Sequence, residues 1–189
     1  RECDKYHQEC HHCPYIYKGG GKKDLSNQVF KKKKEIYQLA PVTFVTCSRW
    51  LKERASQSAL LNGHTNVDIP NPINTGLFKP QNALVARSRM GLPIDKKLIL
   101  FGSVNVTDKR KGIDYFIESC KLLAEMHPEL KEELGVVVYG KNSEQLKPLI
   151  PFQVFPLDFI SNEKDLVNIY NAVDLYVTPS LEENLPTTI

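Results

Sequence analysis

Four short apolar runs constrain the fold of this chain more than any other feature of its sequence. They read LILFG at residues 98–102, GVVVYG at 135–140, FQVFPL at 152–157 and DLYVTP at 174–179. Each run is shorter than an ordinary helix and is apolar almost throughout, which is typical of a strand covered on both faces. The sequence therefore predicts a parallel sheet buried between helices.

The segments between these runs have the 3.6-residue periodicity of amphipathic helices. Residues 162–173 show one such pattern. Residues 112–126 place six apolar or small side chains on one helical face: Ile113, Phe116, Ile117, Cys120, Leu123 and Ala124. Strand and helix thus alternate along residues 81–189, which predicts a Rossmann-like α/β domain with helices on both faces of the sheet.

A shorter α/β pattern precedes this domain. Residues 25–39 suit a helix, and residues 42–69 read as strand, helix and strand, with Ser48 as a helix N-cap. Three prolines then fall within residues 70–80, and such a run can continue neither a helix nor a central strand. We therefore expect three parts: residues 1–71, a hinge at 72–80, and residues 81–189.

The composition is that of an ordinary globular protein. Of 189 residues, 41% are hydrophobic and 25% are charged, which argues against intrinsic disorder. No apolar run reaches the roughly 18 residues that a membrane-spanning helix needs, and the start RECDKYHQEC lacks the apolar core of a signal peptide. The first residue is not methionine, so we expect a fragment whose fold is cut at both ends.

Positive charge is concentrated in the first part of the chain. Residues 1–80 contain 13 Lys and Arg against 7 Asp and Glu, whereas residues 81–189 contain 12 against 15. The main contribution is KKKK at residues 31–34, which can contact the anionic head groups of a membrane or a nucleic acid. A solvated basic helix face is the alternative, and we favour it because no aromatic platform accompanies the lysines.

Cysteines and histidines gather in the loop of residues 1–24, which ends in the flexible break KGGGKKD. Cys10 and Cys13 have the two-residue spacing of zinc ligands, and Cys3 is near in sequence. Either the three thiols form a structural zinc site, or they are free thiols in a loop. Cys47 and Cys120 stand alone in apolar segments, which predicts buried side chains. The odd cysteine count favours a reducing cytoplasm.

Ligands of parallel sheets bind beyond the carboxyl ends of the strands. The candidate positions are therefore the segments that follow Gly102, Gly140, Leu157 and Ser180. The first segment carries three consecutive cations directly before a helix: Lys109, Arg110 and Lys111. Cations together with a helix N-terminus suit a diphosphate. An exposed basic loop is the alternative.

The chain ends in PSLEENLPTTI. Pro186 fits the first position of a helix, and the amides of residues 184–188 would then be available to a phosphate or to sugar hydroxyls. Glu182 and Glu183 suit a sugar, because a carboxylate accepts hydrogen bonds from neighbouring hydroxyls. The alternative is that both merely charge the first turn of a helix.

Several segments occur in the order found in glycosyltransferase family 4, the group 1 glycosyl transferases. They are FVTCSRWL, IPNPINTGLFKP, LILFGS, KRKGIDYFI, VVVYGKN, VFPLDFIS and AVDLYVTPSLEENLPTTI, over about residues 42–189. The joint occurrence of IPNPIN, KG before a helix, and DLYVTPSLEE is specific to this family. More loosely, CHHCP and GGGKKDLSN resemble a subgroup of capsular or exopolysaccharide assembly.

The resemblance implies the GT-B architecture, in which two Rossmann-like domains face each other across a cleft. Residues 1–71 would then end the acceptor-side domain, and residues 81–189 would form the nucleotide-sugar-binding domain. The implied activity is retaining transfer of a sugar from a nucleotide-diphosphate sugar to a glycan or lipid-linked acceptor. The resemblance implies a cytoplasmic location, at the inner face of a membrane, with no nucleic-acid partner.

The resemblance also implies roles for single residues. Lys111 matches the lysine that contacts the donor diphosphate, and Glu183 matches the glutamate beside the transferred sugar; these are the implied catalytic residues. The implied donor-binding residues are Gly102, Ser103, Arg110, Gly140, Lys141, Leu157, Phe159, Asn184, Leu185 and Pro186. The family's second glutamate would fall two residues beyond Ile189, so we expect no transferase activity from this chain alone.

No cofactor is required by this interpretation. The chain contains no Asp-x-Asp pair, which agrees with metal-independent chemistry through Lys111. Two other hypotheses stay open. One is a Rossmann-like module that binds a nucleotide without chemistry. The other is a zinc-stabilised piece that binds nucleic acid through Cys10, Cys13 and the four lysines.

Overall fold

The computed structural model describes residues 3–16 and 24–186. They fall into two compact units, of which the first comprises Arg1–Pro72 and Glu183–Ile189 and the second comprises Ile73–Glu182. Residues 18–23 of the predicted flexible break lie outside the described residues.

The second unit is built on a four-stranded sheet of order β5-β4-β3-β6 in which all neighbours are parallel. Its strands are β3 (Lys97–Asn105), β4 (Leu134–Lys141), β5 (Gln153–Leu157) and β6 (Leu175–Tyr176). These strands coincide with the four apolar runs, so the predicted parallel α/β fold is confirmed. β6 is shorter than predicted, because only Leu175 and Tyr176 pair with β3.

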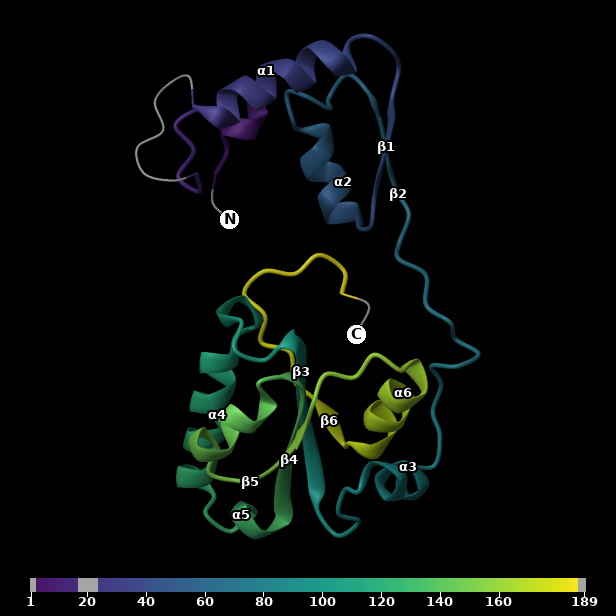
Figure 1. The fold of residues 1–189 in the computed structure, drawn as a ribbon, viewed down its shortest axis with the longest axis vertical. Coiled ribbons are helices and arrows are strands. Elements are labelled where there is room, and N and C mark those ends of the chain that lie inside the picture. The colour runs from purple at the N-terminus through teal and green to yellow at the C-terminus, as the bar shows by residue number, and fades with distance from the viewer. Residues whose placement is uncertain (1–2, 17–23, 187–189) are drawn as a thin grey trace. The chain divides into compact units, whose positions relative to one another are not determined.

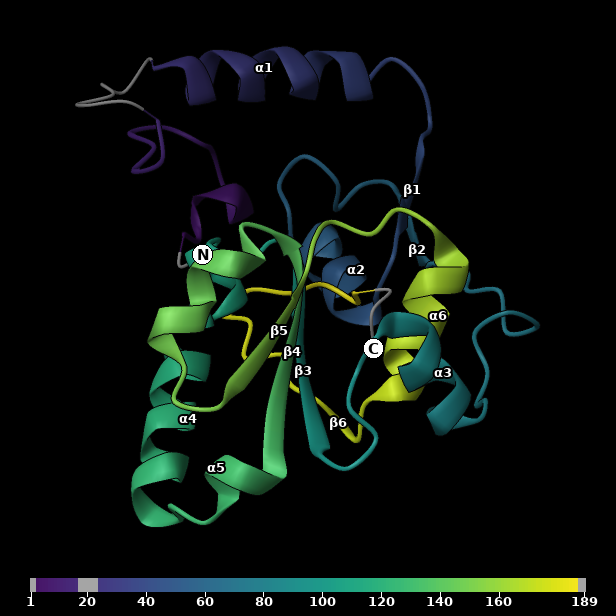
Figure 2. The ribbon, with the colours of Figure 1, turned by 60° about the horizontal axis from the view of Figure 1, so that its bottom comes forward.

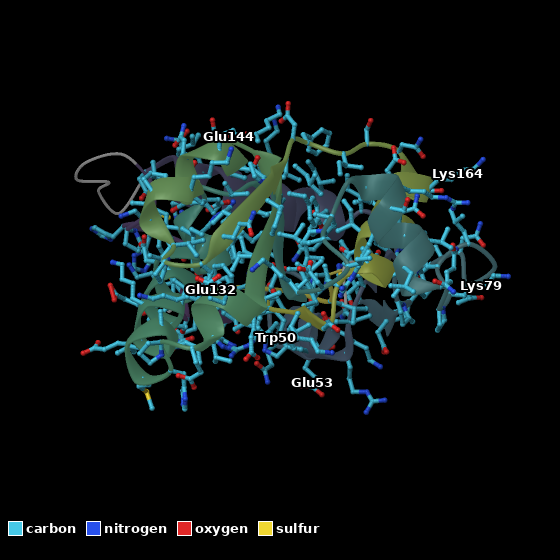
Figure 3. All side chains as sticks on the ribbon, turned by 90° about the horizontal axis from the view of Figure 1, so that it is seen from below. Trp50, Glu53, Lys79, Glu132, Glu144 and Lys164 are labelled. Atoms are coloured by element: carbon cyan, nitrogen blue, oxygen red, sulfur yellow. The ribbon has the colours of Figure 1, made fainter. Side chains whose placement is uncertain are left out.

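Helices cover both faces of this sheet, as Figures 1 and 2 show. One face carries α4 (Ile113–Met126) and α5 (Leu130–Glu133), and the other carries α3 (Ala83–Met90) and α6 (Glu163–Ala172). Two short 3-10 helices complete the unit, η2 (Lys109–Lys111) and η3 (Ser143–Leu149). Charged side chains of the helices, such as Glu144 on η3 and Lys164 on α6, point outward (Figure 3).

Each face of the sheet has its own apolar core. The core under α4 joins Phe101 and Val138 of the sheet to the buried helix residues Ile113, Phe116, Cys120 and Ala124. The core under α3 and α6 contains Leu98, Leu100, Val137, Tyr139, Ala86, Ile169 and Ala172. Alternate residues of a strand point to opposite faces, so two covered faces explain why these strands are apolar throughout. The predicted core face of the helix at 112–126 is confirmed.

The helical periodicity of apolar residues did not predict α3. The residues that this helix buries explain why. They are Ala86 and Arg87, so an arginine stands where an amphipathic pattern would place an apolar side chain. The Arg87 guanidinium donates to the carbonyl of Ala172 at 2.7 Å and to Oδ2 of Asp174 at 2.8 Å. Asp174 also accepts from the amide of Leu98 at 2.8 Å. A buried charge with partners on two segments ties α3 to the amino end of the sheet.

The first unit has a smaller sheet. Its elements are η1 (Lys5–His7), α1 (Leu25–Tyr37), β1 (Thr43–Thr46), α2 (Arg49–Ser56) and β2 (Thr65–Asp68). β1 and β2 form a parallel pair. Ser48 caps α2 as predicted, with its hydroxyl accepting from the amide of Leu51. α2 ends at Ser56, because a turn follows in which Ser58 accepts from the amide of Leu60.

The two isolated cysteines differ in burial. Cys120 is buried as predicted, and that burial raises the pKa of its thiol to about 11. Cys47 is only half-buried, so the prediction of a buried side chain was wrong there: the residue directly follows β1, which belongs to a sheet of only two strands. In the part of the chain that the structure describes, no helix is long and apolar enough to cross a membrane.

Candidate functional site

The loop that follows β3 is fixed at both ends. Val106 is fully buried and Ile113 nearly so, both in the core under α4. The amide of Val106 donates to the carbonyl of Lys141 at 3.1 Å, and Asn142 Nδ2 donates to Asn105 Oδ1 at 3.0 Å. The carboxyl ends of β3 and β4 therefore stay together, while residues 107–112 pass over the edge of the sheet.

This loop carries the three predicted cations in the turn η2. Asp108 caps the turn: its Oδ1 accepts from the amide of Arg110, and its carboxylate binds the Arg110 guanidinium at 2.6 and 3.1 Å. These hydrogen bonds from Arg110 lower the pKa of Asp108. Lys109 Nζ lies 3.8 Å from Asp114, with both side chains exposed. An anion that approaches Arg110 therefore competes with Asp108 for the guanidinium.

The cationic turn lies against the segment that follows β6. The amide of Leu181 donates to the carbonyl of Arg110 at 2.9 Å. Gly112, at φ +74°, lies so close to Pro179 that a Cβ would overlap the Pro179 carbonyl oxygen. Only glycine combines this backbone conformation with this close approach. The structure thus brings Lys109–Lys111 and residues 179–181 together, two segments that are far apart in the sequence.

The predicted glycines of β3 and β4 are close-approach positions. A Cβ at Gly140, where φ is +127°, would overlap the carbonyl oxygen of Ser103, and a Cβ at Gly102 would overlap the ring of Tyr139. The Ser103 side chain is buried, and its hydroxyl has no hydrogen-bond partner among the described residues. Polar atoms buried without a partner are rare in folded proteins and need an explanation.

Lys141 and Phe159 meet at the ends of β4 and β5. Lys141 Nζ lies 5.9 Å from the centre of the Phe159 ring, an attractive cation–π arrangement. Phe159 is 45% exposed, and its amide donates to its neighbour Asp158 at 2.7 Å. Leu157 ends β5 and packs partly buried against the core under α6. These residues present an exposed aromatic ring beside a cation at the same edge of the sheet.

The predicted residues from Glu183 onward belong to the first unit. There the Asn184 side chain accepts from the Ser48 hydroxyl and donates to Cys47 Sγ at 3.1 Å. Leu185 has a φ of +50°, which is uncommon for a side chain of this size. Residues 181–186 are not helical. The helix predicted to begin at Pro186 would run into residues 187–189, which lie outside the described residues, as do the amides of 187 and 188.

The thiols near the N-terminus are free, and Cys3, Cys10 and Cys13 are all half-buried. Burial, followed by the nearby Cys3 and Cys13, raises the pKa of Cys10. Within residues 3–16 and 24–186, no three His, Cys, Asp or Glu side chains are placed to hold a metal ion. A tetrahedral zinc ion needs four ligands and deprotonated thiols, so a structural zinc site at these thiols stays a prediction.

A hollow of about 770 Å³ lies in the first unit. Its lining is largely apolar and aromatic and includes Phe44, Trp50 and Leu51. The one guanidinium that lines it, Arg54, donates to the Tyr6 hydroxyl at 2.9 Å. This lining suits an apolar group rather than a diphosphate, so the hollow is not the site that the cationic turn predicts.

Two residues that shape the cationic turn were not among the predicted site residues: Asp108, and Gly112, which was predicted only as part of the KG motif. Both have signals in the sequence. An aspartate one residue before a polar turn is a preferred N-cap, and a glycine at the end of a turn is preferred where φ is positive. The burial of Val106 carries no such signal, because the polar residues around it read as open loop.

Comparison with known proteins identifies the family. Residues 86–189, more than half of the chain, match the family of glycosyl transferases group 1. The chain belongs to this family. A D-inositol 3-phosphate glycosyltransferase of Thermobispora bispora is 28% identical over 130 residues, which is 62% of this chain and 30% of the relative. The chain thus spans about a third of the length of such relatives.

Other relatives of the chain carry different names. A glycogen synthase of Streptococcus pneumoniae is 26% identical over 145 residues, or 68% of this chain and 29% of the relative. Among solved structures, a sucrose-phosphate synthase of Thermosynechococcus elongatus matches with a TM-score of 0.56 and 20% identity, over 75% of this chain and 35% of that one. This likeness shows that the group 1 chain shares the α/β fold of that enzyme.

Proposed function

We propose that this group 1 protein transfers a sugar, with retained anomeric configuration, from a nucleotide-diphosphate sugar to a glycan or lipid-linked acceptor. The observation that carries the proposal is the contact between the cationic turn and the segment after β6. There, Leu181 bonds to Arg110 and Gly112 packs on Pro179. Three cations are thereby fixed at the carboxyl edge of a parallel sheet, where the ligands of such sheets bind.

The proposed chemistry uses these cations on the leaving group. As the bond between sugar and diphosphate breaks, negative charge develops on the nucleoside diphosphate. A fixed ammonium at Lys111 would stabilise that charge more in the transition state than in the ground state. The first turn of α4, a helix of 14 residues, adds backbone N–H groups and a positive dipole.

The other roles rest on the family pattern. Glu183 would accept hydrogen bonds from hydroxyls of the transferred sugar, together with the amides of residues 184–186. Lys141 and Phe159, with an exposed ring at the end of β5, would lie beside the nucleotide base, because a base can stack on an aromatic ring. We assign Gly102, Ser103, Gly140 and Leu157 to the backbone around the donor. No step of this proposal requires a cofactor.

The acceptor side and the donor side would be divided along the chain. We propose that residues 1–71 contribute to the acceptor side, residues 72–80 to a hinge, and residues 81–189 to the donor side. The names of the relatives point to unlike acceptors, an inositol phosphate and glycogen. On the CHHCP and KKKK segments we propose an acceptor of the capsular or exopolysaccharide kind, carried on a lipid at the inner face of a membrane.

Calorimetric titration tests the donor site. Nucleoside diphosphates and their sugar conjugates are titrated into the protein and into Lys111→Ala, Glu183→Gln and the control Lys131→Ala on α5. Lys111→Ala should weaken binding of both ligand classes by about tenfold or more, since a charged hydrogen bond is lost. Glu183→Gln should weaken only the sugar conjugates, and Lys131→Ala should leave both unchanged. Affinity that ignores the sugar would indicate a nucleotide-binding module without chemistry.

Turnover tests the reaction itself. The full-length protein is screened against nucleotide-diphosphate sugars with lipid-linked acceptors, and release of nucleoside diphosphate is measured. Proton NMR of the first product then reports its anomeric configuration. Product with the configuration of the donor supports the proposal, whereas inverted product contradicts the retaining mechanism.

A further inference from the structure

We propose that the outer face of α1 docks this protein onto an anionic lipid membrane. The inner face of α1 is already occupied. Asn27 and Phe30 are each only 4% exposed, and the ring of Tyr37 packs edge-on against Phe44 with 5.2 Å between ring centres. Asn27 Nδ2 also donates to Glu9 and to the carbonyl of Cys10. The helix is therefore held to its unit along one side and presents its other side outward.

The outward side carries a stripe of apolar side chains. Leu25, Val29 and Ile36 are 60%, 42% and 51% exposed. Their separations of four and seven residues place them on one helical face. Leu39, just after the helix, extends the stripe and is 84% exposed. A run of exposed apolar side chains along one face is unusual on a globular surface and marks a contact site.

Lysines accompany this stripe. Lys31, Lys32, Lys33 and Lys34 occupy four consecutive positions in the middle of α1, and all are exposed. Lys31 lies 3.5 Å from Glu9, and Glu35 is the one acidic residue of the helix. By helical geometry, Lys32 and Lys33 flank the apolar stripe on its two sides. Long lysine side chains at such positions extend their ammonium groups to lipid phosphates while their carbon stems stay on the apolar surface.

Apolar stripe and lysines together select a lipid surface over other anions. An interfacial helix needs both parts, since apolar side chains enter the boundary between head groups and acyl chains while basic side chains bind anionic head groups. A nucleic acid would use the lysines but gain nothing from exposed leucine, valine and isoleucine. The proposal rests on the proposed function only in that a lipid-linked acceptor requires contact with a membrane.

Vesicle flotation tests the proposal on the full-length protein. Vesicles of phosphatidylcholine with about 30% phosphatidylglycerol are compared with phosphatidylcholine alone, at ionic strengths of about 0.1 M and 1 M. We expect binding to the anionic vesicles that weakens at high salt. The double variant Lys32→Gln, Lys33→Gln should weaken binding roughly 25-fold, at about fivefold for each lysine. Leu25→Gln, Val29→Gln should weaken it by roughly tenfold or more.

Matched variants on α4 and α5 control for net charge and for non-specific binding through exposed apolar side chains. Lys121→Gln, Lys131→Gln makes the same charge change. Leu122→Gln, Met126→Gln removes two apolar side chains of α4 that are 56% and 71% exposed and four residues apart. Both control variants should bind vesicles as the unaltered protein does.

If the variant Leu25→Gln, Val29→Gln does not fold, the depth to which α1 enters the bilayer can be measured instead. Trp50 is the only tryptophan of residues 1–189, so in this chain Leu25→Trp in a Trp50→Phe background places the single tryptophan on α1. Its fluorescence should be quenched by lipids brominated in their acyl chains.

Three results would overturn the proposal: no binding to anionic vesicles, equal losses in the α4 and α5 controls, or no quenching. Nucleic-acid binding that depends on the lysines but not on Leu25 and Val29 would overturn it in favour of a polyanion site. Vesicle binding needs neither donor nor acceptor. Its failure therefore leaves the donor titration intact, and failure of that titration leaves vesicle binding intact.

Discussion

The two units differ in how far the faces of their parallel strands are covered by other residues. In the second unit, β3 and β4 lie inside a four-stranded sheet, and Leu98, Leu100 and Val137 are fully buried. In the first unit, a sheet of two strands leaves Val45 of β1 58% exposed. Parallel strands depend on cover over both faces, and only the second unit provides it among the described residues. The burial of apolar side chains therefore stabilises the second unit.

The first unit relies instead on local polar contacts and rings. Asp24 caps α1 and accepts from the amide of Cys13, the hydroxyl of Ser26 and the amide of Asn27. The rings of Tyr37, Phe44 and His64 contact one another edge-on, with centres 5.2 to 6.1 Å apart. Such contacts each contribute little, so single losses should matter less here than in the second unit.

The largest expected difference comes from removing one ring in each unit. Phe101 is 1% exposed and stacks on Phe116 at 4.9 Å, so Phe101→Ala should destabilise the second unit by about 3–5 kcal/mol. Phe44→Ala removes a half-buried ring of the first unit and should cost less than half of that. Denaturant unfolding, followed by unit-specific hydrogen exchange, measures both. Equal losses would contradict the contrast between the units.

The next effect concerns the buried charge of the second unit. Arg87→Met should destabilise by about 2–3 kcal/mol, less than for a fully buried pair because Asp174 is 36% exposed. Burial by itself would raise the pKa of Asp174, but the amide of Leu98 and the charges of Arg87 and Lys97 lower it overall. Its contribution to stability is therefore lost as pH falls below the ordinary range of aspartate. Arg89→Met, at an exposed position of α3, is the matched control and should change stability little.

Two glycines with left-handed backbone give a finer comparison inside the second unit. Gly91 has φ +65° with open space around it, whereas Gly112 has φ +74° with Pro179 against it. Gly91→Ala should cost about 1 kcal/mol for the strained backbone. Gly112→Ala should cost at least about 2 kcal/mol, because the two site segments must also move apart, and it should weaken nucleoside diphosphate binding. If both variants behave alike in stability and binding, the close contact with Pro179 is not needed for the site.

The smallest effect lies in the first unit and depends on pH. Hydrogen bonds from Ser26 and the amide of Cys13 lower the pKa of Asp24 to about 2, from an ordinary value of 3.8. Because the folded state binds this proton less readily than the unfolded state, the contribution of Asp24 is complete above about pH 4 and disappears toward pH 2. Circular dichroism between these pH values should show a small loss of helix at α1 in the unaltered protein. Asp24→Ala, which removes the capping oxygens, should show that loss already at neutral pH, with little further change on acidification.

The same difference in burial explains which elements of the structure could be predicted from the sequence. The strands of the second unit and the core face of α4 were predictable because burial on two faces leaves a plain apolar pattern. α3 was not, since its buried side chain is Arg87, whose partners Ala172 and Asp174 are more than eighty residues away. The cations of the turn were visible in the sequence. Their fixation by Asp108 and by the contact of Gly112 with Pro179 needed the three-dimensional structure.

Hydrogen exchange with and without donor measures whether the carboxyl edge of the second unit binds a nucleotide-diphosphate sugar. The full-length protein is exchanged with nucleoside diphosphate, with its sugar conjugate and without ligand. We expect slower exchange of the amides in residues 105–112, 140–142 and 178–182 when ligand is present. Unchanged exchange in these segments, with protection instead around the hollow of the first unit, would contradict it.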